Sequence, residues 1–172
     1  MLVYAGIDEA GYGPILGSLV VTRCVFELPE LAADTHPPSL WSLLRAAVCR
    51  RPADDRRRIP VNDSKLLYQP ASGPARLELG VLSFLKSLDW TAPTLDDLLR
   101  LLAFDELSFP DHQPWYSGPQ GGPALRVQVQ PAMLRTSRKR LMRVLERVGL
   151  RLVDDCGSKA ACNWIFVAVK FE

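Results

Sequence analysis

Two adjacent acidic residues, Asp8 and Glu9, end an apolar segment near the start of the chain, and Gly11 and Gly13 follow directly. Aspartate and glutamate are poor strand formers, so two in succession at a strand end need a reason. Carboxylate oxygens are the ligands that Mg²⁺ and Mn²⁺ prefer. In two-metal phosphodiester hydrolysis, carboxylates hold the ions that activate water and stabilise the leaving oxygen. The residue types therefore indicate a divalent metal site, and the alternative is a solvated acidic turn.

Two strands and a tight turn are predicted to position these carboxylates. Residues 2–8 alternate with the two-residue period of a strand, and residues 18–26 are rich in β-branched side chains. The glycines and prolines of residues 11–17 turn the chain between them, which predicts an antiparallel hairpin. Because successive strand residues point to opposite faces, Asp8 and Glu9 can share a site only if the strand breaks toward the turn.

Two motifs in order resemble the type 2 ribonuclease H (ribonuclease HII) family. The segment from Ala5 to Gly17 is similar to that family's acidic, glycine-rich signature, and Asn62-Asp63-Ser64-Lys65-Leu66 is similar to its N-D-S-K-K-L motif. Together the motifs cover well under half of the chain. The resemblance implies an α/β fold, in which a ribonuclease H-like mixed sheet opens with an antiparallel hairpin and is flanked by helices.

The resemblance also implies a role for each residue of the first motif. Asp8 and Glu9 would be the first two of four catalytic carboxylates and would bind Mg²⁺ or Mn²⁺. Gly11 and Gly13 would present backbone groups to the ribose 2′-hydroxyl, which distinguishes RNA from DNA. Tyr12 stands where the family has an arginine, so a neutral ring replaces a phosphate-binding cation at a substrate-binding position.

The second motif and the end of the chain supply the remaining candidates. By the same resemblance, Ser64 and Lys65 would contact the nucleic-acid backbone; taken alone, the motif is an ordinary polar turn. Residues 150–154 are predicted to form a strand that ends at an acidic residue. Asp154 is therefore the candidate third catalytic carboxylate and metal ligand, and the alternative is a surface turn. Downstream of Asp155 only Glu172 is acidic. We therefore expect one domain over residues 1–172 that lacks the C-terminal part of the family.

Three functions remain open from the sequence. The first is a metal-dependent endonuclease that hydrolyses the RNA strand of RNA/DNA hybrids or acts at ribonucleotides in a duplex. The second is a catalytically incomplete relative that binds nucleic acid. The third is an unrelated soluble enzyme.

Helices are predicted at residues 39–50, 72–88 and 136–148, with Gly149 ending the last one. This last helix is strongly basic, and its three- and four-residue spacings bring Arg140, Arg143 and Arg147 close together. Such a row suits a phosphate backbone, although a solvated face is the alternative. The cationic residues of this region are Arg135, Arg138, Lys139, Arg140, Arg143, Arg147 and Arg151.

Composition fits a single soluble domain. The chain has 172 residues, of which 48% are hydrophobic and 23% charged, and its net charge is +2. No apolar run approaches a membrane span, and no secretory signal begins the chain. Four cysteines without a CxxC pair favour reduced thiols over zinc. These features predict a cytoplasmic monomer with no membrane association.

Overall fold

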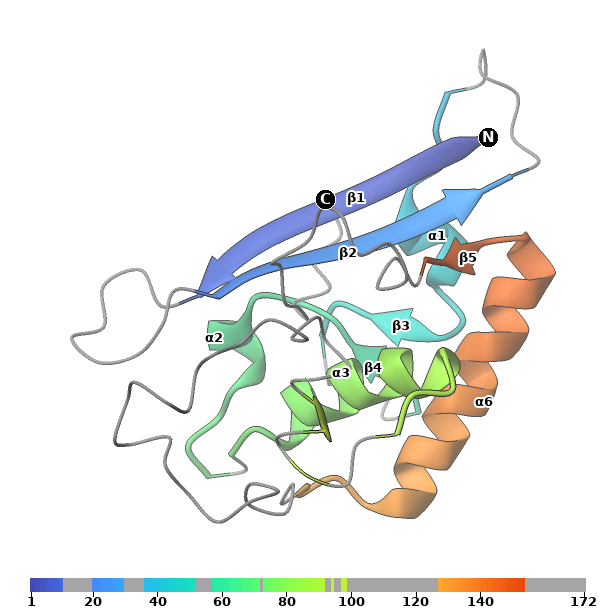
Figure 1. Ribbon diagram of the computed structural model, residues 1–172. Helices are drawn as coiled ribbons and strands as arrows, with labels where there is room; N and C mark the ends of the chain where they lie inside the picture. The colour runs from blue at the N-terminus through green and yellow to red at the C-terminus, as the bar shows by residue number, and fades with distance from the viewer. Residues whose placement is uncertain are drawn as a thin grey trace.

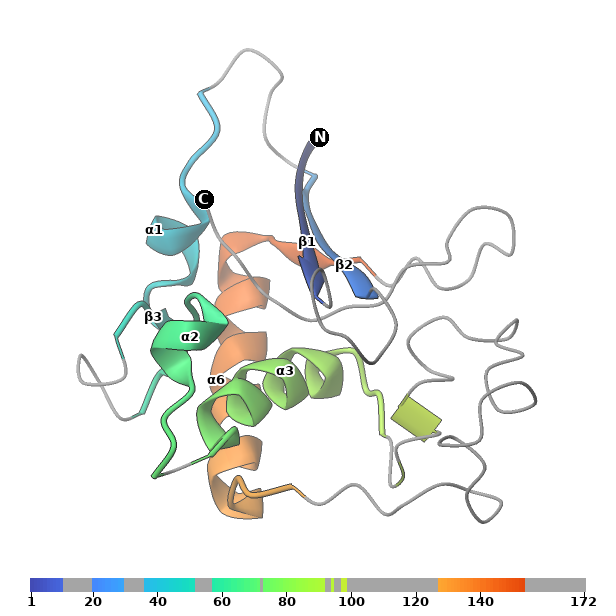
Figure 2. The ribbon, with the colours of Figure 1, turned by 90° about the vertical axis from the view of Figure 1, so that its left-hand side faces the viewer.

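A computed structural model describes residues 1–10, 20–29, 36–51, 57–71, 73–91, 94, 97–98 and 127–153. A small sheet lies over a layer of helices (Figure 1), and Figure 2 shows the same two layers from the side. This arrangement confirms the α/β class. Across these segments, no helix combines the length and apolar composition that a membrane crossing requires.

The predicted antiparallel hairpin is present. Strand β1 (Leu2–Ala10) pairs with strand β2 (Val20–Leu28) without interruption, from Leu2 opposite Leu28 to Ala10 opposite Val20. One face of β1 is covered, because Leu2 and Tyr4 pack against the core. On the other face, the side chains of Val3 and Ile7 are 47% and 73% exposed. This alternation is typical of a sheet with one solvated face.

A third strand, β5 (Arg151–Leu152), pairs antiparallel with β2, so the strand order is β1-β2-β5. The sheet is therefore antiparallel throughout its described part, whereas the sequence predicted a mixed sheet. A parallel pairing occurs in a separate ladder, formed by β3 (Val48–Cys49) and β4 (Ile59–Pro60). The predicted strand at residues 164–171 lies outside the described residues.

The first helix is shorter than predicted. Helix α1 (Leu40–Leu44) begins at Ser39, whose hydroxyl caps it as expected, but it ends well before Arg50. The chain turns after Leu44, because Val48 and the following cysteine enter β3 and are buried beside β4. Here tertiary pairing overrides the helical pattern.

Two longer helices cross beneath the sheet. Helix α3 (Ala75–Ser87) matches its prediction closely, and it packs against α6 (Pro131–Val148). Helix α6 starts five residues earlier than predicted, because Pro131 occupies its first turn, where proline costs no hydrogen bond. The Glu78 carboxylate of α3 also accepts hydrogen bonds from the backbone N–H groups of Gln128 (2.6 Å) and Val129 (3.1 Å). This contact fixes the chain just before α6.

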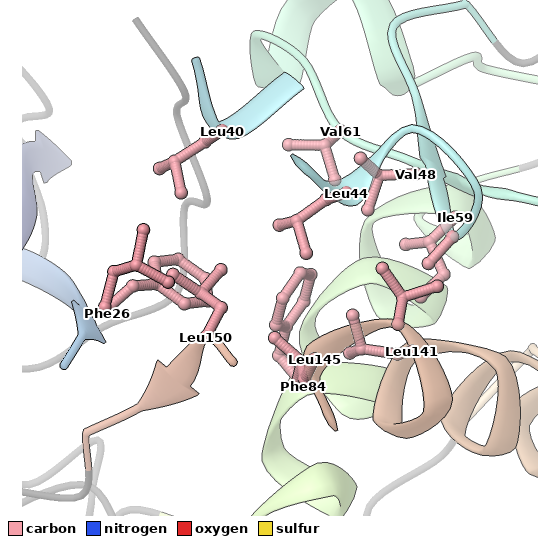
Figure 3. Close-up of a cluster of buried hydrophobic side chains, with 13 residues drawn as sticks. Phe26, Leu40, Leu44, Val48, Ile59, Val61, Phe84, Leu141, Leu145 and Leu150 are labelled. Atoms are coloured by element: carbon pink, nitrogen blue, oxygen red, sulfur yellow. The ribbon is translucent and has the colours of Figure 1, made fainter. Parts of the chain in front are cut away.

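One hydrophobic core joins the sheet to the helices (Figure 3). Phe26 from β2 meets Phe84 from α3 edge-on, with ring centroids 6.1 Å apart. Leu44 from α1 and Leu141 from α6 are both fully buried in the same cluster. Because each such side chain contributes about 1.5–3 kcal/mol on burial, the hairpin is held to the helical layer by hydrophobic packing.

Candidate metal and nucleic-acid site

Asp8 and Glu9 occupy consecutive positions of a regularly paired strand. Asp8 pairs with Thr22 and Glu9 with Val21, and β1 continues to Ala10. The strand therefore does not break between the two acidic residues, as it would have to for both to face one site. Consecutive positions of a regular strand alternate between its two faces.

The glycine turn itself is not placed. Gly11, Tyr12 and Gly13, the predicted substrate-binding residues of the first motif, lie outside the described residues. Any approach of Glu9 to the site of Asp8 depends on that segment.

The second motif folds into a short capped helix, α2 (Ser64–Leu67). The Asp63 carboxylate accepts a hydrogen bond from the backbone N–H of Lys65 at 2.8 Å, which caps the helix. The Asn62 amide donates to the carbonyl of Arg50 at 3.0 Å, and its oxygen accepts from the N–H of Asp63 at 2.8 Å. Asn62 and Asp63 thus shape the backbone and tie α2 to the end of β3.

The two predicted substrate contacts on α2 are accessible. Ser64 and Lys65 are exposed, whereas Leu67 is buried and anchors the helix. In Figure 1, α2 and the Ala10 end of β1 lie toward the same side of the molecule, and α6 lies toward the other side. The described end of the first motif and the second motif are therefore on one side of the fold, although they are far apart in the sequence.

The candidate third carboxylate, Asp154, follows the last described residue and is not placed. The N–H of Val153 donates to the carbonyl of Val25 at 3.0 Å, and Val25 pairs with Ala5. With strands about 4.8 Å apart and about 3.3 Å per residue, the backbone of Val153 lies about 14 Å from Asp8. Strand β5 therefore approaches the hairpin from the β2 edge, and β2 separates it from the strand that contains Asp8.

The thiol nearest the acidic end of β1 is not available as a ligand. Cys24 pairs with Gly6, two positions before Asp8, and burial raises the pKa of its thiol to about 12. Cys24 is therefore protonated at neutral pH and does not offer a thiolate. Within the described segments, no three His, Cys, Asp or Glu residues form a group that could hold a metal ion.

Tyr4 has a structural role that the sequence did not reveal. Its hydroxyl donates to the carbonyl of Pro38 at 2.6 Å, and desolvation raises the pKa of this phenol. The bond ties the middle of β1 to the segment that leads into α1. No local pattern predicts this contact, because the partners are 34 residues apart.

The chain matches no protein-family model, no curated protein and no solved structure. The resemblance to ribonuclease HII therefore rests on the two sequence motifs alone.

Proposed function

We propose that the chain is a metal-dependent endonuclease of the ribonuclease HII type, with a ribonuclease H-like fold, that hydrolyses the RNA strand of RNA/DNA hybrids. The observation that best supports this function is the position of Asp8 near the end of the hairpin strand β1, directly before the glycine-rich part of the first motif. The second motif, on α2, lies on the same side of the molecule (Figure 1).

In this proposal each residue has a defined role. Asp8 would hold Mg²⁺ or Mn²⁺, and Glu9 would join it where the backbone turns its side chain toward the same face. The ions would supply an activated water and stabilise the leaving oxygen. Gly11 and Gly13 present their backbone to the ribose 2′-hydroxyl, and Tyr12 stacks on the substrate. Asp154 supplies a third carboxylate.

Ser64 and Lys65 contact the phosphate backbone from α2. Both side chains are exposed, and Lys65 provides a positive charge that orients the duplex without reading its sequence.

A second candidate is a relative that binds nucleic acid but does not cleave it. The specific observation in its favour is the strand order β1-β2-β5, because β5 leads into Asp154 from the far side of β2. A site with only two carboxylates would bind metal weakly and react slowly.

Cleavage of an end-labelled RNA/DNA hybrid with Mg²⁺ or Mn²⁺ separates these candidates. We expect metal-dependent cleavage by the natural chain and a loss of at least about 100-fold in Asp8→Asn, because a ligand of the metal that activates the water is removed. Glu146→Gln, which also removes one carboxylate but from the exposed side of α6, is the matched control and should cleave normally. Equal cleavage by Asp8→Asn would reject the assignment of Asp8. Hybrid binding without cleavage would support the second candidate.

A further inference from the structure

Helix α6 concentrates the positive charge of the chain. It contains six cationic residues and one glutamate, so it has a formal charge of +5, whereas the whole chain has +2. The rest of the protein is therefore slightly acidic, and the field around α6 is local to that helix.

The structure divides these six cations into two groups. Arg138 donates through Nε to the carbonyl of Lys86 at 2.6 Å and pairs with Asp89, which joins α6 to the end of α3. Arg140 donates to the carbonyl of Arg57 at 2.8 Å, which joins α6 to the segment before β4. These two arginines hold the helix to the protein, and both are partly buried.

The other four cations are exposed and recur at every fourth residue. We name them the α6 stripe: Arg135, Lys139, Arg143 and Arg147. None of them forms an ion pair or a side-chain hydrogen bond within the part of the chain that the structure describes.

This pattern is costly for a face that only meets water. Like charges four residues apart on a helix destabilise it by about 0.2–0.5 kcal/mol per pair, and the stripe contains three such pairs in succession. Solvated helix faces usually alternate the two signs, whereas Glu146 is the one acidic residue of α6. An anionic ligand along the stripe would remove this repulsion.

We propose that the α6 stripe binds the phosphate backbone of a nucleic-acid duplex. At about 1.5 Å per residue, its twelve-residue span is about 18 Å long, which corresponds to about five phosphates of one strand at about 3.4 Å of axial rise each. Each cation can neutralise a phosphate and release counterions, so the binding is independent of base sequence and sensitive to salt.

A duplex fits this helix better than a membrane surface. Amphipathic helices that lie on bilayers insert an apolar face between the lipids. The apolar face of α6 is instead buried in the protein, where Leu134, Leu141 and Val144 pack against other elements. This apolar face is therefore not available to a bilayer, whereas the cationic stripe is exposed.

The stripe is separate from the carboxylate site. In Figure 1, α6 lies on the side of the molecule away from the Ala10 end of β1. The stripe is thus a second contact region, and its function does not depend on the proposed cleavage.

Fluorescence anisotropy of a labelled 20-base-pair RNA/DNA hybrid in EDTA tests the stripe without cleavage. We expect the double variant Lys139→Gln/Arg143→Gln to bind at least about tenfold more weakly near 100 mM salt, and the slope of log K against log salt to fall by about 2. Arg45→Gln/Arg76→Gln removes the same charge from the C-cap of α1 and from α3, and is the matched control. The charge-conserving variant Lys139→Arg/Arg143→Lys should bind like the natural chain.

Three outcomes overturn the proposal: no hybrid binding by the natural chain, equal weakening in both double variants, or binding to phosphatidylserine vesicles but not to the hybrid. If the proposed nuclease function is wrong but the stripe proposal is right, the hybrid will still bind through the stripe, and Mg²⁺- or Mn²⁺-dependent cleavage will be absent.

Discussion

Asp63 lies in the motif that resembles a nuclease signature, yet its carboxylate is engaged by its own helix. It accepts a hydrogen bond from the backbone N–H of Lys65 at 2.8 Å, and the side-chain amide of Asn62 donates a hydrogen bond to the carbonyl of Arg50. The first half of the motif therefore shapes the backbone, while Ser64 and Lys65 remain exposed. A motif identified by resemblance can thus combine structural residues with candidate ligand contacts.

This division predicts different effects at neighbouring positions. Asp63→Ala should lower the free energy of unfolding by about 1 kcal/mol, because the cap of α2 is lost. Asp63→Ser keeps an acceptor oxygen and should be close to the natural chain, and Lys65→Ala should be neutral. Urea denaturation measures all three. A neutral Asp63→Ala would show that water replaces the cap.

Neighbouring residues of the same type can also differ in role for reasons that the sequence does not contain. Arg138 and Lys139 are adjacent, but only Arg138 faces α3, where it bonds to Lys86 and Asp89. The sequence spacing alone groups Arg140 with Arg143 and Arg147 as candidate phosphate contacts. The structure shows that Arg140 bonds to the carbonyl of Arg57 instead.

At the scale of elements, the sequence predicted the features that depend only on neighbouring residues. The β-branched hairpin strands, the Ser39 cap of α1 and the glycine that ends α6 all appear as expected. The predicted length of α1 was wrong because it depends on distant partners. The predicted start of α6 was wrong although Pro131 is a local signal for a first helical turn. Residues 48–49 leave the helical pattern to pair with residues 59–60, and Glu78 fixes the chain before Pro131.

Two glycines in these helices should respond oppositely to alanine. Gly149 ends α6 with a φ of 67°, so Gly149→Ala should cost about 1 kcal/mol even though no atom lies within 4 Å of the added Cβ. Gly80 lies inside α3, and an added Cβ would meet the Pro60 carbonyl oxygen at an ordinary 3.6 Å. Gly80→Ala should therefore stabilise the protein by up to about 1 kcal/mol.

Thermal unfolding followed by circular dichroism distinguishes the two effects. Gly149→Ala should lower the midpoint and Gly80→Ala should raise it. A lowered midpoint for Gly80→Ala would mean that α3 lies closer to β4 than the structure indicates.

At the scale of the whole molecule, the sequence could not predict how elements that are distant in the chain pair. Strand β5 was predicted from its apolar pattern, but its place beside β2 depends on contacts more than 120 residues apart, such as that between Arg151 and Glu27. The candidate site shows the same limit. The positions of Asp8 and Glu9 at the hairpin end followed from local pattern, whereas the relation of Asp154 to Asp8 depends on strand order.

The shared core predicts that the hairpin and the helices unfold together. Leu141 of α6 has no exposed surface and lies in the cluster that contains Phe26 of β2 and Phe84 of α3. Leu141→Ala should therefore lower the free energy of unfolding by about 2–5 kcal/mol. Met133→Ala, at a 44% exposed position of the same helix, should change it by less than about 0.5 kcal/mol. Far-ultraviolet circular dichroism and tryptophan fluorescence should give coincident urea transitions in both variants. Separate transitions in Leu141→Ala would show that the hairpin is stable without the helical layer.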